Sequence, residues 1–323
     1  MKGRILQILR EAEDYVSGQY LCELLDISRQ AVWKYIRQLK EEGYEIEGIK
    51  NRGYKISDHK DLLNENEIRA YLPLNYQLFY QESVDSTNTL AKKVAEETEA
   101  SRVLLVANQQ VKGKGRRGRV WESPKGKDIY MSLLLREEIE PANAAMLTLV
   151  MGLSVAQAIE EFAKVSPRIK WPNDIVLDKK KICGILTEMS AQVDYVNYIV
   201  IGVGINVNGE SFSEELRDKA SSIKLISGEM QQRAKLIGKI MDCFEENLKL
   251  FMQKQDMTLL LDTYESYLIS KGSEVTVIAG DESYRGKALG INSKGQLRVE
   301  KEDKSIENVF AGEVSVRGIY GYV

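Results

Sequence analysis

Residues 168–208 constrain the fold most, because they form a series of strand-like segments joined by very short turns. The segment is RIKWPNDIVLDKKKICGILTEMSAQVDYVNYIVIGVGINVN, with turns at Asp178–Lys180 and around Asp194. Strands joined by tight turns pair in antiparallel fashion, since a parallel pair needs a crossover of about a dozen residues or more. We therefore expect an antiparallel or mixed sheet with helices to one side, an α+β fold rather than a doubly wound one.

Neighbouring segments extend this central region. RVLLVANQQ (102–110) and DIYMSLLLR (128–136) predict two more strands. The most apolar segment, 144–163, is interrupted by polar residues and ends shortly after two glutamates, so a buried helix from about 141 to 163 is expected rather than a membrane span. Further helices are predicted at 231–253 and 256–269.

Residues 272–323 contain only short strand-like segments. Five of them, SEVTVIAG, SYRGKALGI, QLRVEK, IENVFAG and EVSVRGI, predict a small β-barrel. A chain of 323 residues is also longer than one hydrophobic core usually supports. The changes in pattern predict three domains, at 1–60, 61–270 and 271–323.

The N-terminal residues match the pattern of a winged helix-turn-helix. The helix RILQILREA is followed by a short helix, a break at Asp26-Ile27 and a second helix with Ser28 as its expected N-cap. YEIEGIKNRGYKIS then predicts a β-hairpin wing. The apolar stripe of the second helix consists of Val32, Ile36 and Leu39. The alternative is a protein-interaction module with an incidental basic face.

Polar residues of this region form a candidate DNA-binding set. They are Ser28, Arg29, Gln30, Lys34, Arg37, Lys50 and Arg52, from the second helix and the wing. The net charge of the chain is −3, so the argument for nucleic acid is local. Operator-binding proteins of this type usually contact two half-sites, which predicts a homodimer.

The chain is poor in residues that build metal sites or catalytic triads. Its one histidine, His59, lies in a polar connector, and its three cysteines are far apart in sequence. This composition excludes histidine-based triads and most zinc sites, and no metal-binding residue is predicted. Separated cysteines, and a first segment without the apolar core of a signal peptide, predict a cytoplasmic protein.

A basic, glycine-rich segment, NQQVKGKGRRGRVW (108–121), follows a predicted strand. Its glycines allow the backbone to approach a ligand closely, and its lysines and arginines supply charge for an anion. It is not a P-loop, because G-x-x-x-x-G-K-[ST] is absent. A solvated surface loop is the alternative.

Three other segments offer groups to a ligand. DSTN (85–88) precedes an amphipathic helix and has more cap-competent side chains than one helix start needs. Lys181 begins a predicted strand and is expected to point inward. Gly202 and Gly204 share one face of a strand, which suits either a bound ligand or close helix–sheet packing.

Taken together, five segments resemble the biotin–protein ligases, in the group that also represses the biotin operon. They are DSTN (85–88), QVKGKGRRGRVW (110–121), KWPND (170–174), KICGIL (181–186) and GVGIN (202–206). With the winged helix and the C-terminal strands, the resemblance covers nearly the whole chain. It implies a central sheet like that of class II synthetases and an SH3-like C-terminal barrel.

The resemblance also implies a two-step reaction. Biotin and ATP, with Mg²⁺, give biotinyl-5′-AMP and pyrophosphate, and the biotin is then transferred to one lysine of the biotin carboxyl carrier protein. Biotin and ATP are thus substrates, and no tightly bound prosthetic group is implied. In the repressor group the adenylate is the corepressor, and the homodimer binds operator DNA. No membrane partner is implied.

Residue roles follow from the same motifs. Arg116 would face the adenylate phosphate and Lys181 the biotin carboxylate, as the catalytic groups. Lys114 stands where the family usually has arginine, which keeps the charge but loses a two-pronged hydrogen bond. Asn173 and Asn206 are implied as adenine or ribose contacts. The residues implied for biotin and its adenylate are Ser86, Thr87, Asn88, Gln110, Lys114, Gly115, Arg116 and Lys181.

Two other functions stay open at this point. A repressor that senses a ligand without catalysis would also need the winged helix, but it would leave the cations around the pocket unexplained. A lipoate ligase of the related fold would activate lipoate in place of biotin. The DSTN segment and the intact basic loop argue against the lipoate ligase.

Overall fold

The computed structural model describes all residues except 58–60, 280–281, 312–313 and 319–323. His59 therefore lies outside the described residues. The chain divides into two compact units. The N-terminal unit comprises Met1–Leu72 with Gln232–Gly238, and the larger unit comprises Pro73–Gln231 with Lys239–Val323.

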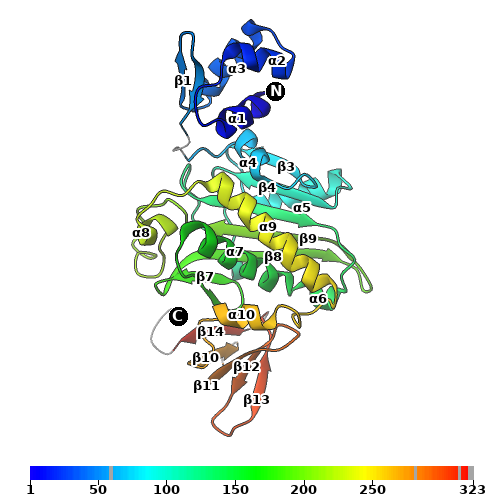
Figure 1. Ribbon diagram of the computed structural model, residues 1–323. Helices are drawn as coiled ribbons and strands as arrows, with labels where there is room; N and C mark the ends of the chain where they lie inside the picture. Colours follow the sequence, from blue (N-terminus) through cyan, green and yellow to red (C-terminus); the bar gives the residue numbers. More distant parts are fainter. Residues whose placement is uncertain (58–60, 280–281, 312–313, 319–323) are drawn as a thin grey trace. The chain divides into compact units, whose positions relative to one another are not determined.

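The N-terminal unit has the expected helices and wing (Figure 1). Its elements are α1 (Lys2–Glu11), α2 (Gly18–Leu25), α3 (Arg29–Glu41), β1 (Ile46–Ile49), β2 (Gly53–Ile56) and α4 (Glu65–Tyr71). Asp26 ends α2 in the left-handed conformation, and the Ser28 hydroxyl accepts a hydrogen bond from the Ala31 amide at the start of α3. Strands β1 and β2 pair in antiparallel fashion. These features confirm the predicted break, N-cap and wing.

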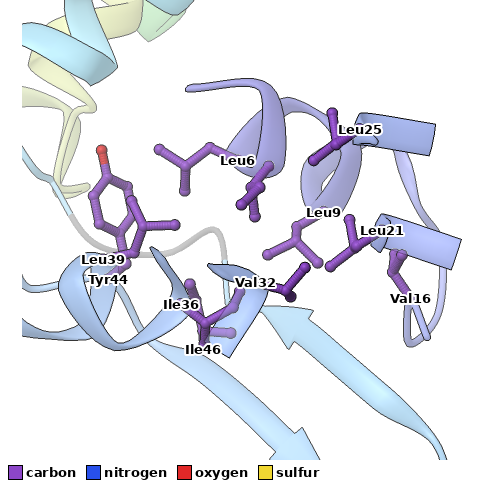
Figure 2. Packing of buried hydrophobic residues seen from close by; sticks show 11 residues of the cluster. Leu6, Leu9, Val16, Leu21, Leu25, Val32, Ile36, Leu39, Tyr44 and Ile46 are labelled. Carbon is purple, nitrogen blue, oxygen red and sulfur yellow. The ribbon is translucent and has the colours of Figure 1, made fainter. Parts of the chain in front are cut away.

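The core of this unit joins all three N-terminal helices to the wing (Figure 2). Val32, Ile36 and Leu39 are buried in it, as their spacing predicts. The cluster consists of Ile5, Leu6, Leu9, Val16, Leu21, Leu25, Val32, Ile36, Leu39, Tyr44 and Ile46. Because the apolar stripe of α3 is buried in this core, the opposite face of the helix is exposed to solvent.

The larger unit contains a seven-stranded mixed sheet in the order β3-β4-β5-β9-β8-β7-β6. Only β3 and β4 pair in parallel, and the other neighbours are antiparallel. The strands are β3 (Gln77–Gln81), β4 (Arg102–Ala107), β5 (Ile129–Leu135), β6 (Arg168–Lys170), β7 (Asp174–Leu177), β8 (Lys180–Ala191) and β9 (Val196–Ile205). The tight turns occur where the sequence predicts them, and the α+β class is confirmed.

Helices cover both faces of this sheet, so the expectation of helices to one side is wrong. The Thr148 and Thr187 hydroxyls are 2.7 Å apart, which places α7 on the odd-numbered face of β8. Asn88 of α5 donates to Glu188 on the opposite face. The helices are α5 (Thr87–Glu97), α6 (Pro141–Ala144), α7 (Leu147–Ala163), α8 (Ile223–Ser227), α9 (Arg233–Met252) and α10 (Leu261–Tyr267).

The segment Pro141–Ala163 is long and apolar enough to cross a membrane by composition. In this structure 72% of its most apolar window is buried within the protein. It is therefore the core helix that the sequence predicts.

The C-terminal region forms a five-stranded antiparallel sheet in the order β13-β12-β11-β10-β14. Its strands are β10 (Glu274–Ala279), β11 (Glu282–Ile291), β12 (Leu297–Glu300), β13 (Ile306–Val309) and β14 (Val314–Gly318). The five predicted strands are thus present. The Trp171 indole donates to the Gly295 carbonyl at 3.0 Å, which connects this sheet to the central one.

Candidate active site

One pocket of the larger unit lies where α5, the basic loop and strands β8 and β9 meet. It is lined by Ser86, Thr87, Asn88, Gln110, Lys114, Gly115, Arg116, Trp121, Asn173, Lys181, Gly184, Ile185, Leu186, Gly202, Val203 and Gly204. Every residue predicted in this part of the chain is among them except Asn206. Asn206 is buried and donates to the Ser221 carbonyl at 3.1 Å, so the structure does not bring it to the pocket.

The start of α5 brings hydroxyl and amide groups to the pocket. Ser86 occupies the N-cap position, but its side chain makes no capping bond with the described residues of the helix. The side-chain oxygen of Gln110 caps the helix instead, because it accepts from the Thr87 backbone N–H at 2.8 Å. The hydroxyl of Ser86 is therefore not committed to the helix that it precedes.

Ser132 of β5 connects two of these residues. It is completely buried, and its hydroxyl lies 2.7 Å from both the Thr87 hydroxyl and the Asn88 side-chain oxygen. One hydroxyl proton cannot serve both neighbours, so Thr87 donates to Ser132 when Ser132 donates to Asn88. Since the Thr87 hydroxyl proton is then used, its oxygen is left to accept a hydrogen bond from a ligand.

Asn88 is held in place from its other side as well. Its amide nitrogen donates to Glu188 at 2.8 Å, and Glu188 is paired with Lys92 at 2.6 Å. Burial acts to raise the pKa of Glu188, but the hydrogen bonds from Lys92 and Asn88 outweigh it and keep this pKa below its usual value. An ionised Glu188 therefore orients Asn88.

The two glycines of β9 make room for protein side chains. A Cβ at Gly202 would lie 2.1 Å from the Asn88 side-chain oxygen, and one at Gly204 would lie 2.5 Å from the Trp121 ring. Close packing thus explains both glycines, although both also line the pocket. Gly184 of β8 likewise faces Trp121, at 2.8 Å.

The basic loop contributes only part of its charge to the pocket. Lys114, Gly115 and Arg116 line it, whereas Arg117 and Arg119 are exposed. A short 3₁₀ turn, Arg116–Gly118, causes this division, with Arg117 and Gly118 at positive φ. Residues 117–120 are exposed, so the alternative hypothesis of a solvated surface loop fits this part of the segment.

Arg116 is partly buried and bonds to neutral oxygens. It donates to the Asn173 side chain at 2.8 Å and to the Ala311 carbonyl. Burial is the main reason that the pKa of Arg116 lies below its usual value, and the charge of Asp174 opposes this effect. An arginine stays protonated in proteins, so the pocket holds a cation whose hydrogen-bond acceptors are uncharged.

Lys181 points into the pocket, as its place at the start of the strand predicts. Its ammonium group lies 2.6 Å from Asp174 and 5.3 Å from the centre of the Trp121 ring. The Trp121 indole N–H is buried without a hydrogen-bond partner among the described residues. Such an unpaired donor is costly, so it suits a site that a polar ligand completes.

Sequence reasoning missed Trp121, Ser132 and Glu188. Trp121 is the last residue of the basic segment, and the pattern of that segment concerns only its glycines and its charges. Ser132 is the single polar residue of a buried strand, IYMSLLL, which is a usable signal. Glu188 gives no comparable signal, because its position depends on the pairing of β8 with β9 and on the placement of α5.

The candidate DNA-binding residues occupy the exposed side of α3 and the wing. Arg29, Gln30, Lys34 and Arg37 are exposed there. Arg29 donates to Gln19 at 2.8 Å, and Arg37 is paired with Glu41 at 2.9 Å. On and beside the wing, Lys50 is exposed, and Arg52 pairs with Asp14 at 3.0 Å and stacks over Tyr15. Exposed pairs of this kind contribute about 0–1 kcal/mol, so they exchange easily for phosphate contacts.

Comparisons with known proteins match this arrangement. A model of the Biotin/lipoate A/B protein ligase family matches residues 80–206, an HTH domain model matches 3–55, and a Biotin protein ligase C terminal domain model matches 272–317. The bifunctional ligase/repressor BirA of Bacillus subtilis is 36% identical over 322 residues, with 98% of both chains covered. The chain belongs to the bifunctional ligase/repressor BirA family.

Other relatives agree with this placement. The BirA protein of Escherichia coli is 30% identical over 314 residues, covering 97% of this chain and 96% of that protein. A solved biotin protein ligase from Aquifex aeolicus, in complex with biotin and ATP, superposes with a TM-score of 0.66. It is 33% identical and covers 75% of this chain and 99% of its own. The resemblance to the biotin–protein ligases is thereby confirmed.

Proposed function

We propose that this protein is a biotin–protein ligase that also represses transcription. It forms biotinyl-5′-AMP and pyrophosphate from biotin and ATP, and then transfers the biotin to one lysine of a biotin carboxyl carrier protein. The observation that carries the proposal is the composition of the pocket. Hydroxyl and amide groups of Ser86, Thr87, Asn88 and Gln110 line it together with the cations Lys114, Arg116 and Lys181.

The cations of the pocket suit the first step, in which two negatively charged groups must meet. An anionic carboxylate must approach an anionic phosphate, and at about 4 Å with an effective dielectric constant of about 20 the pair repels by roughly 4 kcal/mol. Fixed cations offset this cost and stabilise the transition state. Arg116, bonded to neutral oxygens, retains its charge for the phosphate. Lys181 reaches the carboxylate and shares its charge with Asp174 until then.

The hydroxyl and amide groups suit the ureido group of biotin. Thr87, with its proton directed to Ser132, accepts from an N–H, and Ser86 and Asn88 are the other contacts. Lys114 and Gly115 border the adenylate, and Asn173 supports it beside Arg116. Mg²⁺ enters as Mg-ATP and is held mainly by the phosphates. Among the described residues no cluster of three metal-ligating side chains occurs.

The winged helix supplies the second activity. The protein binds operator DNA as a homodimer when the adenylate is present, through Ser28, Arg29, Gln30, Lys34, Arg37, Lys50 and Arg52. The domain division at 1–60, 61–270 and 271–323 and a cytoplasmic location belong to the same proposal.

Exchange of labelled pyrophosphate into ATP tests the ligase activity. Exchange that depends on biotin and is lost in Lys181→Gln supports the proposal, since that variant controls for contaminating ligase. Exchange with lipoate alone would identify a lipoate ligase. Selection of duplexes from a random-sequence library, with biotin and Mg-ATP present, tests the DNA-binding activity. Selected duplexes without any exchange would point to a ligand-sensing repressor.

A further inference from the structure

The exposed face of α3 has a large aromatic ring among its positive charges. Its exposed residues are Arg29, Gln30, Trp33, Lys34, Arg37, Lys40 and Glu41. Trp33 is 59% exposed, although tryptophan is highly buried on average. At the 3.6-residue repeat of a helix, Trp33 lies directly between Arg29 and Arg37.

Trp33 is not part of the core of its unit. The buried side of α3 is occupied by Val32, Ile36 and Leu39, so the indole ring points to the other side. The Arg37 guanidinium lies over this ring, 5.7 Å from its centre. A single exposed apolar side chain is ordinary. This one differs because cations surround it on the helix that a winged helix-turn-helix inserts into the major groove.

The charges around Trp33 select one kind of occupant. Four basic side chains and one acid lie on this face of α3, which fits a polyanion better than a neutral or basic protein surface. The flanking cations can contact phosphates, but phosphate contacts carry no sequence information. The ring between them adds no charge for phosphate, and the apolar feature that the major groove offers it is the thymine 5-methyl group.

We propose that Trp33 is a specificity-determining residue that packs against the methyl group of a thymine in the operator. This inference rests on the proposed DNA-binding function. It assigns base recognition to a residue absent from the predicted contact set, and it assigns backbone contacts to the cations beside it.

Replacement of the ring separates these two roles. Full-length protein with biotin and Mg-ATP is titrated into a duplex selected from the random library and into an unselected duplex. Trp33→Ala should lower affinity for the selected duplex by about tenfold and leave the unselected duplex and the salt dependence unchanged, because no charge is lost. Lys34→Ala should weaken both duplexes and reduce the salt slope. Leu24→Ala, which truncates an apolar residue 50% exposed on α2, is the matched control and should change neither.

A thymine-to-uracil scan identifies the contact, because deoxyuridine lacks only the methyl group. At one or more positions uracil should weaken the wild-type protein several-fold and leave Trp33→Ala unaffected, while Trp33→Phe keeps part of the effect. The inference is wrong if no position couples to Trp33, or if Trp33→Ala weakens both duplexes equally. It is also wrong if Trp33→Ala affects only dimer formation in sedimentation, which would mark a protein contact. Failure of the wild type to select any duplex would instead reject the DNA-binding function.

Discussion

Single side chains decide which charges in the pocket are available to a substrate. Lys181 has an acidic partner, Asp174, at 2.6 Å, whereas Arg116 bonds to the Asn173 side chain and to a backbone carbonyl. An incoming anion therefore finds Arg116 already charged and only weakly compensated. Lys181 must divide its charge between Asp174 and the ligand.

Arg116→Gly tests the retention of the intermediate. The variant lacks the cation that we propose faces the adenylate phosphate, so it should release biotinyl-5′-AMP and label lysines of unrelated proteins. Labelling of serum albumin, measured by mass spectrometry, should rise well above the wild-type level. Arg119→Gly, in the exposed half of the loop, is the control and should behave like the wild type. Loss of DNA binding alone in Arg116→Gly would show that the loop has another role.

Ser132→Ala tests the hydrogen-bond relay to Thr87 and Asn88. Its loss should raise the KM for biotin about tenfold, because a buried hydrogen bond contributes roughly 1–3 kcal/mol when one partner is left unsatisfied. Ser154→Ala is the matched control, since Ser154 is equally buried and bonds to Val150 and Asn247 away from the pocket. Equal effects of both variants on the KM for biotin would contradict the relay.

Strand β9 illustrates how an element serves the site at a larger scale. From Ile199 to Ile205 its odd-numbered face is apolar and buried, and its even-numbered face has glycines where Asn88 and Trp121 pack closely. Without side chains at these glycines, α5 and the basic loop can both pack closely against the same face of β9. The sheet supports the site from below, while Asn88 of α5 and Trp121 of the basic segment pack against the glycines of the strand.

Gly204→Ala tests this packing. The added Cβ would lie 2.5 Å from Trp121, so the ring must move, and overpacking of this kind typically costs about 1–3 kcal/mol. Biotin-dependent exchange should fall, and a second change, Trp121→Phe, should restore part of it. Gly152→Ala in α7, whose nearest contact would be 3.7 Å, should leave exchange intact. Full activity in Gly204→Ala would show that the position of Trp121 does not matter.

The elements themselves were largely predictable, because hairpins and amphipathic helices are local patterns. The turn near Asp178, the N-cap at Ser28 and the five C-terminal strands all follow from neighbouring residues. The placement of α5 opposite α7 was not predictable, since it depends on which face of the sheet each helix covers. Ser132 and Glu188 lie beside the pocket only because α5 covers their face of the sheet and brings Thr87 and Asn88 into contact with them. Sequence motifs therefore predicted the residues that line the pocket better than the residues that hold them in place.

At the scale of the whole molecule, the two proposed activities belong to different parts of the chain. The pocket lies in the larger unit and the cationic face of α3 in the N-terminal unit. Substitutions in the N-terminal unit should then change DNA binding without changing catalysis. Substitutions in the pocket should change catalysis, and they should change DNA binding only because the homodimer that binds DNA needs the adenylate.

Arg37→Ala tests this separation. Affinity for the selected duplex should fall, and the slope of its salt dependence should decrease by about one, because one phosphate contact is lost. Biotin-dependent exchange should keep its wild-type rate. Lys93→Ala, an exposed lysine of α5 that pairs with Glu97 one helical turn away as Arg37 pairs with Glu41, is the matched control and should leave DNA binding unchanged. A parallel loss of exchange in Arg37→Ala would show that the two parts are not independent.

Transfer of biotin to a carrier domain tests the central claim most directly. The purified full-length protein is incubated with biotin, Mg-ATP and a biotin carboxyl carrier domain, and the carrier is measured by mass spectrometry. If the protein is a biotin–protein ligase, the mass of the carrier should increase by one biotinyl group on a single lysine. The increase should depend on ATP and should be absent with Lys181→Gln. An unmodified carrier, with folded protein and all substrates present, would contradict this function.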